Sequence, residues 1–170
     1  MVVELDQQHV LSIGSSFGFD AEAIHPYYGT WAIPSDSVDH VTVRGTLEYL
    51  SGPQRVWFCN ELHRVLKPAG TATLYLPYWT SPNAFADPYL QWPPITEMSL
   101  SYLCDQQFRS RNRLPYPLPK ADFDISYGYS YASEWHVRSD AARDYATKHN
   151  VGIIRELVAT LTKREDSAIL

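Results

Sequence analysis

The stretches IPSDSVDHVTVRGTLEYL, residues 33–50, and ELHRVLKPAGTATLYLPYWTSP, residues 61–82, decide the fold. Together they read as a loop, a strand, a second loop, a helix, a glycine turn and another strand. The two strands are the apolar runs Val38 to Val43 and Thr71 to Leu76, which suit the buried interior of a sheet. This order predicts an α/β unit.

The helix of this unit has clear signals at both ends. Ser51 and Gln54 form a capping box at its start, and Pro53 sits in the tolerant first turn. Lys67-Pro68 ends the helix, and Gly70 supplies the turn into the next strand. Apolar side chains at helical spacing predict one buried face: Val56, Cys59, Leu62 and Leu66.

The chain before this unit is less regular. Val10 to Gly14 is a short apolar run that ends in glycine, and it predicts the first strand of the sheet. Residues 14–37 have no convincing helical period and are rich in Gly, Pro, Ser and Tyr. We expect a long loop there, with at most one helical turn around Asp20 to Ile24.

The chain after this unit alternates between patterned and unpatterned segments. A second helix is expected to begin at Thr96, with Ile95 and Leu100 forming a hydrophobic staple. The expected elements that follow are a strand from Glu134 to Arg138, a helix capped by Ser139 and reaching His149, and a long final strand from Val151 to Thr162.

The segment from Pro115 to Tyr131 has no clear period and carries three prolines followed by many tyrosines. It could be a lid whose aromatic rings stack on a planar substrate. It could equally be a packed arm that covers the sheet or forms a dimer surface. The second interpretation is favoured because basic residues are not interleaved with the aromatic ones.

Composition narrows the class of protein. A chain of 170 residues suits a single domain, residues 1–170, and 45% hydrophobic with 19% charged residues indicates a globular one. The net charge of −5 argues against strong nonspecific binding of nucleic acid. Cys59 and Cys104 lack metal-type spacing, so neither a metal site nor a disulfide framework is predicted. With no membrane-spanning run and no signal peptide, we expect a soluble, cytoplasmic protein.

Several motifs occur in the order of the class I S-adenosylmethionine (AdoMet) methyltransferases. The chain resembles this family at Ile33-Pro34, Asp36 to Asp39, Val41 to Val43, Thr46 to Leu50 and Glu61 to Gly70. The resemblance implies a minimal Rossmann-like methyltransferase fold, with a mostly parallel sheet, helices on its faces and an antiparallel C-terminal strand. It also implies AdoMet as cofactor.

The resemblance assigns a first set of cofactor-binding residues to the loop after the first strand. Gly14-Ser15-Ser16-Phe17-Gly18 resembles the family's G-x-G-x-G loop, whose glycines let the backbone approach the methionine part of AdoMet. Ser16 replaces the middle glycine. The contacts are expected from Gly14, Ser15, Ser16 and Gly18.

The part of the chain that follows is shorter than in the family. Only ~20 residues separate Gly18 from Val38, too few for the usual helix, strand and connections. Asp20 is the carboxylate that suits the ribose, and Trp31 or Ile33 would lie near the adenine. Trp31 could instead fill the space of the missing helix.

The ends of the next two strands carry the remaining candidates. Arg44 could hold an acidic substrate or the AdoMet carboxylate, or lie in a surface salt bridge. Tyr78, Trp79 and Trp92 are expected to form a substrate wall.

Methyl transfer relies chiefly on alignment of the reacting groups. Where a base is needed, Asp87 or His136 would be the catalytic residue. The alternatives are a loop-capping aspartate and an ordinary surface histidine.

Three functions follow from this sequence. The first is an AdoMet-dependent methyltransferase acting on a small-molecule or nucleotide substrate. The second is a degenerate methyltransferase fold without catalysis, acting as a binding or scaffold subunit. A Rossmann oxidoreductase is weaker, because no G-x-G-x-x-G with a following acid is present. The missing helix should leave one sheet face exposed, so we also expect a homo-oligomer that covers it.

Overall fold

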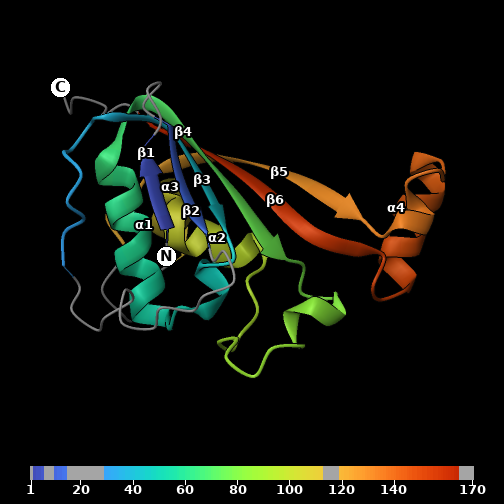
Figure 1. Ribbon diagram of the computed structural model, residues 1–170. Helices are drawn as coiled ribbons and strands as arrows, with labels where there is room; N and C mark the ends of the chain where they lie inside the picture. Colours follow the sequence, from blue (N-terminus) through green and yellow to red (C-terminus); the bar gives the residue numbers. More distant parts are fainter. Residues whose placement is uncertain (1, 6–9, 15–28, 113–118, 165–170) are drawn as a thin grey trace.

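The computed structural model describes residues 2–5, 10–14, 29–112 and 119–164. Its centre is a sheet of six strands in the order β1-β2-β3-β4-β6-β5 (Figure 1). The strands are β1 Val2–Leu5, β2 Val10–Gly14, β3 Val38–Arg44, β4 Leu66–Pro77, β5 Phe123–Tyr131 and β6 Ile154–Lys163. The α-helices are α1 Gly52–Val65, α2 Glu97–Cys104, α3 Gln106–Arg111 and α4 Asp140–His149, with the short 3-10 helices η1 Leu47–Tyr49, η2 Pro82–Ala84 and η3 Ser133–Trp135.

The sheet is mixed, which corrects the expectation of a mostly parallel one. Strands β2, β3 and β4 pair in parallel. The pairs β1–β2, β4–β6 and β5–β6 are antiparallel. The parallel core and the antiparallel final strand were predicted, whereas β1 and β5 were not. Both additional strands are sheet edges that pair with only one neighbour, so antiparallel pairs outnumber parallel ones.

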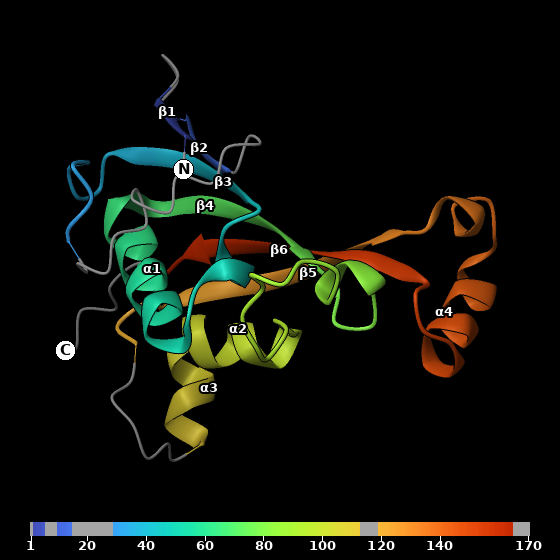
Figure 2. The same ribbon diagram turned by 60° about the horizontal axis from the view of Figure 1, so that its bottom comes forward.

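The described helices that cover the sheet lie on one side of it. Helices α1, α2 and α3 pack below the sheet in Figure 2, and no described helix lies above it. Among the described residues the expected helices therefore cover one face of the sheet, and the other face is left exposed, as the missing helix predicted. The core between helices and sheet is formed by fully buried apolar side chains, among them Val41, Val43, Leu74, Leu157, Leu161, Phe58, Leu62 and Leu100.

The opposite face of the sheet is polar. The paired rows across β3, β4 and β6 place threonines there: Thr42, Thr71, Thr73, Thr160 and Thr162. His40 adds a hydrogen bond of 2.7 Å between its Nδ1 and Thr71 Oγ1. A sheet with one polar face tolerates water on that side. The reason given for self-association, an apolar face in need of cover, does not apply to this face.

Helix α1 begins as predicted. The Ser51 amide donates a hydrogen bond of 2.9 Å to Gln54 Oε1, which satisfies one orphan donor of the first turn. The helix ends at Val65, because Leu66 is already extended, with φ −68° and ψ 137°. The left-handed residue of the following turn is Ala69, at φ 59°. Gly70 is needed for close approach, since a Cβ there would lie 2.8 Å from the Lys67 carbonyl oxygen.

The C-terminal half holds both confirmed and wrong predictions. Helix α2 begins after Thr96 and α4 after Ser139, as predicted, with each side chain accepting from a backbone amide of its first turn. The predicted strand from Glu134 to Arg138 is wrong, since η3 and a turn occupy this stretch. The final strand begins at Ile154 and not at Val151.

The strands β5 and β6 form a long hairpin whose connection carries α4. In Figures 1 and 2 this helix lies beyond the end of the sheet, away from the other helices. The tyrosine-rich segment was expected to be irregular but forms β5. Its Tyr127 and Tyr129 hydroxyls donate to Glu97 at the start of α2, which agrees with a packed role. None of the described helices is long and apolar enough to cross a membrane.

Candidate functional site

The carboxyl ends of the three parallel strands meet at one edge of the sheet. The register aligns Gly14 at the end of β2 with Arg44 at the end of β3, and Arg44 with Tyr75 near the end of β4. Ligands of open α/β sheets bind outside this edge. The candidate site is therefore built from the loops that follow these strands.

A small pocket opens beside the end of β4. It holds about 250 Å³ of space between the atoms, part of it open to solvent. Its lining comes from η1, the end of β4 and the loop before α2: Glu48, Leu76, Pro77, Ala84, Leu90, Gln91, Pro94 and Ile95. Glu48 is the one ionisable group in this lining, and sequence analysis gave it no ligand role.

Glu48 is an unusual carboxylate, because its side chain is largely buried. Burial raises its pKa, while backbone amides and the nearby Arg55 guanidinium act in the opposite direction more weakly. Its Oε2 atom is buried and has no hydrogen-bond partner among the described residues. Buried acceptors are nearly always paired, so this oxygen is a candidate contact for a ligand.

Arg55 organises the loops around the pocket, and sequence analysis missed it. The buried guanidinium donates to the carbonyl oxygens of Leu47 at 3.2 Å, Pro93 at 3.0 Å and Gln91 at 3.1 Å. Burial lowers its pKa. The one available signal was an arginine three residues before Phe58 on the apolar side of α1. Arg55 thus joins the helix to both loops that line the pocket.

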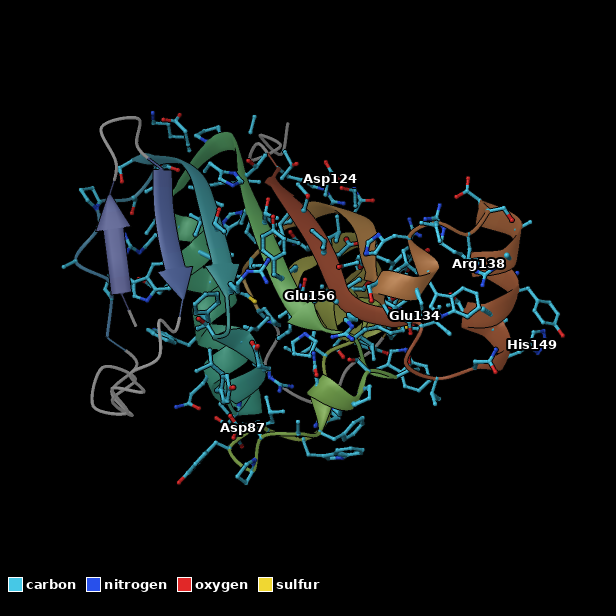
Figure 3. The ribbon with its side chains drawn as sticks, turned by 45° about the vertical axis from the view of Figure 1, so that its right-hand side comes forward. Asp87, Asp124, Glu134, Arg138, His149 and Glu156 are labelled. Atoms are coloured by element: carbon cyan, nitrogen blue, oxygen red, sulfur yellow. The ribbon has the colours of Figure 1, made fainter. Side chains whose placement is uncertain are left out.

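The two predicted catalytic residues lie in different places. The Asp87 carboxylate accepts hydrogen bonds from the Tyr49 hydroxyl at 3.0 Å and from the Tyr89 amide at 2.9 Å. Burial and then Asp87 raise the pKa of Tyr49 to about 12. His136 is exposed and follows η3. In Figure 3, Asp87 lies far from Glu134 and Arg138, which flank His136 in sequence. The structure does not bring the two together.

The predicted substrate wall divides into two aromatic groups. Tyr78 is buried and its ring packs 5.7 Å from the Tyr129 ring and 6.1 Å from that of Trp79. Trp92 is 79% exposed and lies 6.2 Å from Phe85. Phe85 and Trp92 belong to the loop that supplies Ala84 and Gln91 to the pocket, which leaves exposed aromatic surface at its side.

Arg44 is already engaged with other side chains. Its guanidinium forms a salt bridge of 2.7 Å to Glu156 and lies 4.0 Å from the centre of the Tyr75 ring. Figure 3 shows Glu156 on β6, beside the end of β4. The surface salt bridge that sequence analysis left open as an alternative is therefore present. The proposed contact with a ligand carboxylate stays a prediction.

The predicted adenine residues lie along α1. Trp31 packs 5.3 Å from Phe58, and its amide donates to Glu61 Oε2 at 2.7 Å. Arg64 donates to the carbonyl oxygens of Ile33 at 2.9 Å and Trp31 at 3.1 Å. The segment that precedes β3 thus runs along the outer side of α1 (Figure 1).

Trp31 thus packs against α1, and its expected place near the adenine stays a prediction. The other predicted cofactor residues, Ser15, Ser16, Gly18 and Asp20, lie outside the described residues. Of that loop, the structure describes only its first residue, Gly14.

The family model that matches this chain and a solved structure similar to it are both of methyltransferases. Residues 13–74 match the family described as a methyltransferase domain, which confirms the predicted resemblance over that stretch. The chain is similar to a SAM-dependent methyltransferase from Archaeoglobus fulgidus, with a TM-score of 0.53 and 13% identity over 77% of this chain and 62% of that one. A SAM-dependent methyltransferase from Methanosarcina mazei gives a TM-score of 0.48 and 15% identity over 79% and 63%. Comparison with curated proteins found no match.

The chain therefore has an α/β methyltransferase-like fold, and a methyltransferase-domain match spans β3, α1 and most of β4. It covers less than two thirds of the length of either solved structure.

Proposed function

We propose that this protein is an AdoMet-dependent methyltransferase that acts on a small-molecule or nucleotide substrate at the carboxyl edge of β2, β3 and β4. The observation that carries the proposal is the pocket at this edge, where the buried carboxylate of Glu48 lacks a hydrogen-bond partner among the described residues. The match of residues 13–74 to a methyltransferase domain supports the same edge as the cofactor side.

The described residues at this edge are compatible with a bound cofactor. Gly14 ends β2 and Gly45, at φ 64°, follows β3, so the backbone carries no side chain at these two positions. AdoMet supplies a methyl group on a positively charged sulfur. The rest of the cofactor set is Ser15, Ser16, Gly18, Asp20, Trp31, Ile33 and Arg44, of which Arg44 would act only after releasing Glu156.

The protein's own contribution would be mainly alignment. Holding an acceptor atom in line with a methyl donor can supply a large part of a rate enhancement. Tyr78, Trp79 and Trp92 would contact the substrate from the side of the pocket. Asp87 would serve as a base only if its Tyr49 hydrogen bond rearranged, and His136 only if the hairpin end approached the edge.

Calorimetric titration with AdoMet and with S-adenosylhomocysteine tests the proposal. The wild type is expected to release or absorb heat with both. Gly14→Leu should abolish the signal, because a bulky side chain would occupy the space of the cofactor. Gly52→Leu is the matched control, since nothing lies within 4 Å of a Cβ at Gly52. Absence of binding by the folded wild type at millimolar AdoMet would contradict the proposal.

A second candidate function is a binding or scaffold subunit without catalysis. It is favoured by the engagement of Arg44 with Glu156, which occupies a side chain that was expected to contact a ligand. In this function the protein would associate with a partner or with itself and bind no AdoMet. Light scattering at high micromolar concentration would detect the proposed homo-oligomer, and a monomer would contradict it.

A further inference from the structure

The pocket beside β4 combines one buried charge with apolar walls. Leu76, Ala84, Leu90 and Ile95 provide hydrocarbon, and Pro77 and Pro94 add ring carbons. Glu48 supplies the only ionisable oxygen atoms of the lining. A ligand that fits must therefore match the Glu48 carboxylate, which only accepts hydrogen bonds when it is ionised, and the Gln91 amide, beside apolar walls.

We infer that this pocket binds the ammonium group of a small organic amine, with Glu48 as its counter-ion. The inference deepens the proposed function, because it names a primary amine as the substrate class of that site. It does not depend on AdoMet, since the amine contact is made by this chain alone.

The size of the pocket supports an ammonium group. Its enclosed part has room for about one water-sized group, and an –NH₃⁺ group is of that size. The methylene groups next to the nitrogen would contact Leu90 and Ala84. A larger cationic group, such as a guanidinium, would not enter without displacing the lining.

The charges around the pocket also favour a cation. Glu48 Oε2 needs a donor, and a buried carboxylate is stabilised strongly by a hydrogen-bonded positive charge. Arg55 lies nearby, but its donors are directed to main-chain carbonyl oxygens. Glu156 adds a second negative charge that acts on Glu48. An anionic ligand would meet the Glu48 carboxylate of the lining.

A trapped water is the simplest competing occupant. A water can donate one hydrogen bond to Oε2, but it does not offset the carboxylate charge. The two occupants differ in a measurable way. If the pocket binds an ammonium ligand, its affinity for the amine should increase as pH rises and Glu48 ionises. If the pocket holds only water, added amine should not bind.

The test uses n-butylammonium chloride, with n-butanol as a neutral probe of the same shape, titrated into the cofactor-free protein at constant ionic strength. Binding is followed by NMR chemical shifts of the backbone amides of residues 84–95. The expected result is saturable shifts with the amine, and binding at least ~10-fold weaker for Glu48→Gln and for butanol. Glu134→Gln, an exposed change on the far hairpin (Figure 3), should bind like the wild type.

A second variant keeps the test informative if Glu48→Gln is poorly folded. Ala84→Leu fills the pocket and leaves the carboxylate in place, and it should also abolish the shifts. Equal binding of amine and butanol, or unchanged binding by Glu48→Gln, would overturn the inference. Absence of shifts with the wild type would overturn it too, with water then the sole occupant. AdoMet calorimetry on the same sample reports separately on the proposed function.

Discussion

The Arg55 guanidinium donates a hydrogen bond of 3.0 Å to the carbonyl oxygen of Pro93, and so joins helix α1 to the loop before α2. The same side chain bonds to carbonyl oxygens of η1. No carboxylate of a described residue lies within salt-bridge distance of it. A positive charge is thus kept buried by main-chain dipoles, and the shape of the pocket depends on it.

Arg55→Met should lower the free energy of unfolding by about 2–4 kcal/mol, because buried carbonyl oxygens lose charged donors. Equilibrium urea unfolding measures the change. Arg138→Ala is the control, since Arg138 is exposed at the hairpin end and its loss should change stability by less than about 0.5 kcal/mol. Equal effects of the two substitutions would show that the Arg55 contacts do not stabilise the fold.

Short-range signals account for much of what the sequence predicted correctly. The Ser51 amide donates to the Gln54 side chain, and the Thr96 and Ser139 side chains accept from amides three residues later, so the starts of α1, α2 and α4 are encoded locally. The strands β1 and β5 were missed because strand formation depends on a partner distant in sequence. In β5 the tyrosines face α2 or water, and the simple alternation of a half-buried strand is obscured.

The predictions for the candidate site differ in the same way, between features that local sequence indicates and features that depend on residues distant in sequence. The edge itself was predicted, because the order of strands and helices determines where parallel strands end. Glu48 was not predicted to contact a ligand, since nothing in the neighbouring sequence reveals that the loop containing residues 84–95 packs beside it. Arg55 was missed for a similar reason, because its acceptors include Gln91 and Pro93, 36 and 38 residues away.

Glu48 should make stability depend on pH in a direction opposite to that of a salt-bridged acid. Its pKa is raised in the folded protein above 4.5, so the folded chain holds this proton to higher pH than the unfolded chain. The stability from the protonated form is present at low pH and declines as pH rises from 4.5 through the raised pKa. Arg55 and Glu156 are the charged groups that act on it.

Thermal unfolding of wild type and Glu48→Gln between pH 4.5 and 8 measures this effect. The variant should become the more stable of the two as pH rises, because glutamine carries no charge to bury. Glu134→Gln, at a fully exposed position, should not show this trend. A constant difference between wild type and Glu48→Gln across the range would mean that Glu48 has the same pKa in both states.

Cys59 on α1 and Cys104 on α2 should be unreactive in the native protein. Their sulfur atoms lie 3.6 Å apart and both side chains are buried. The hydrogen bond between them and their burial raise the pKa of the Cys104 thiol, so little thiolate forms near neutral pH.

Thiol titration with Ellman's reagent at pH 7.5 should therefore detect neither cysteine until denaturant is added. Ser110→Cys, at an exposed position of α3, is the positive control and should react at once with one equivalent of reagent. Rapid native reaction of the wild type would show that α1 and α2 separate readily.

The turn between α1 and the body of β4 offers a matched pair of substitutions at neighbouring residues. Ala69 is exposed and has a left-handed backbone, with φ 59°, which is unfavourable for a residue with a Cβ. Gly70 is buried, and a Cβ there would lie 2.8 Å from the Lys67 carbonyl oxygen and 3.2 Å from that of Asp39.

Ala69→Gly should raise the free energy of unfolding by about 0.5–1 kcal/mol, because relief of the left-handed strain exceeds the added entropy of the unfolded chain. Gly70→Ala should lower it by about 2 kcal/mol, since main-chain atoms of Lys67 and Asp39 would have to move. Urea unfolding with an unchanged m-value measures both. Destabilisation by Ala69→Gly would show that Ala69 is not strained, and a neutral Gly70→Ala would show that the approach of β3 to this turn is not close.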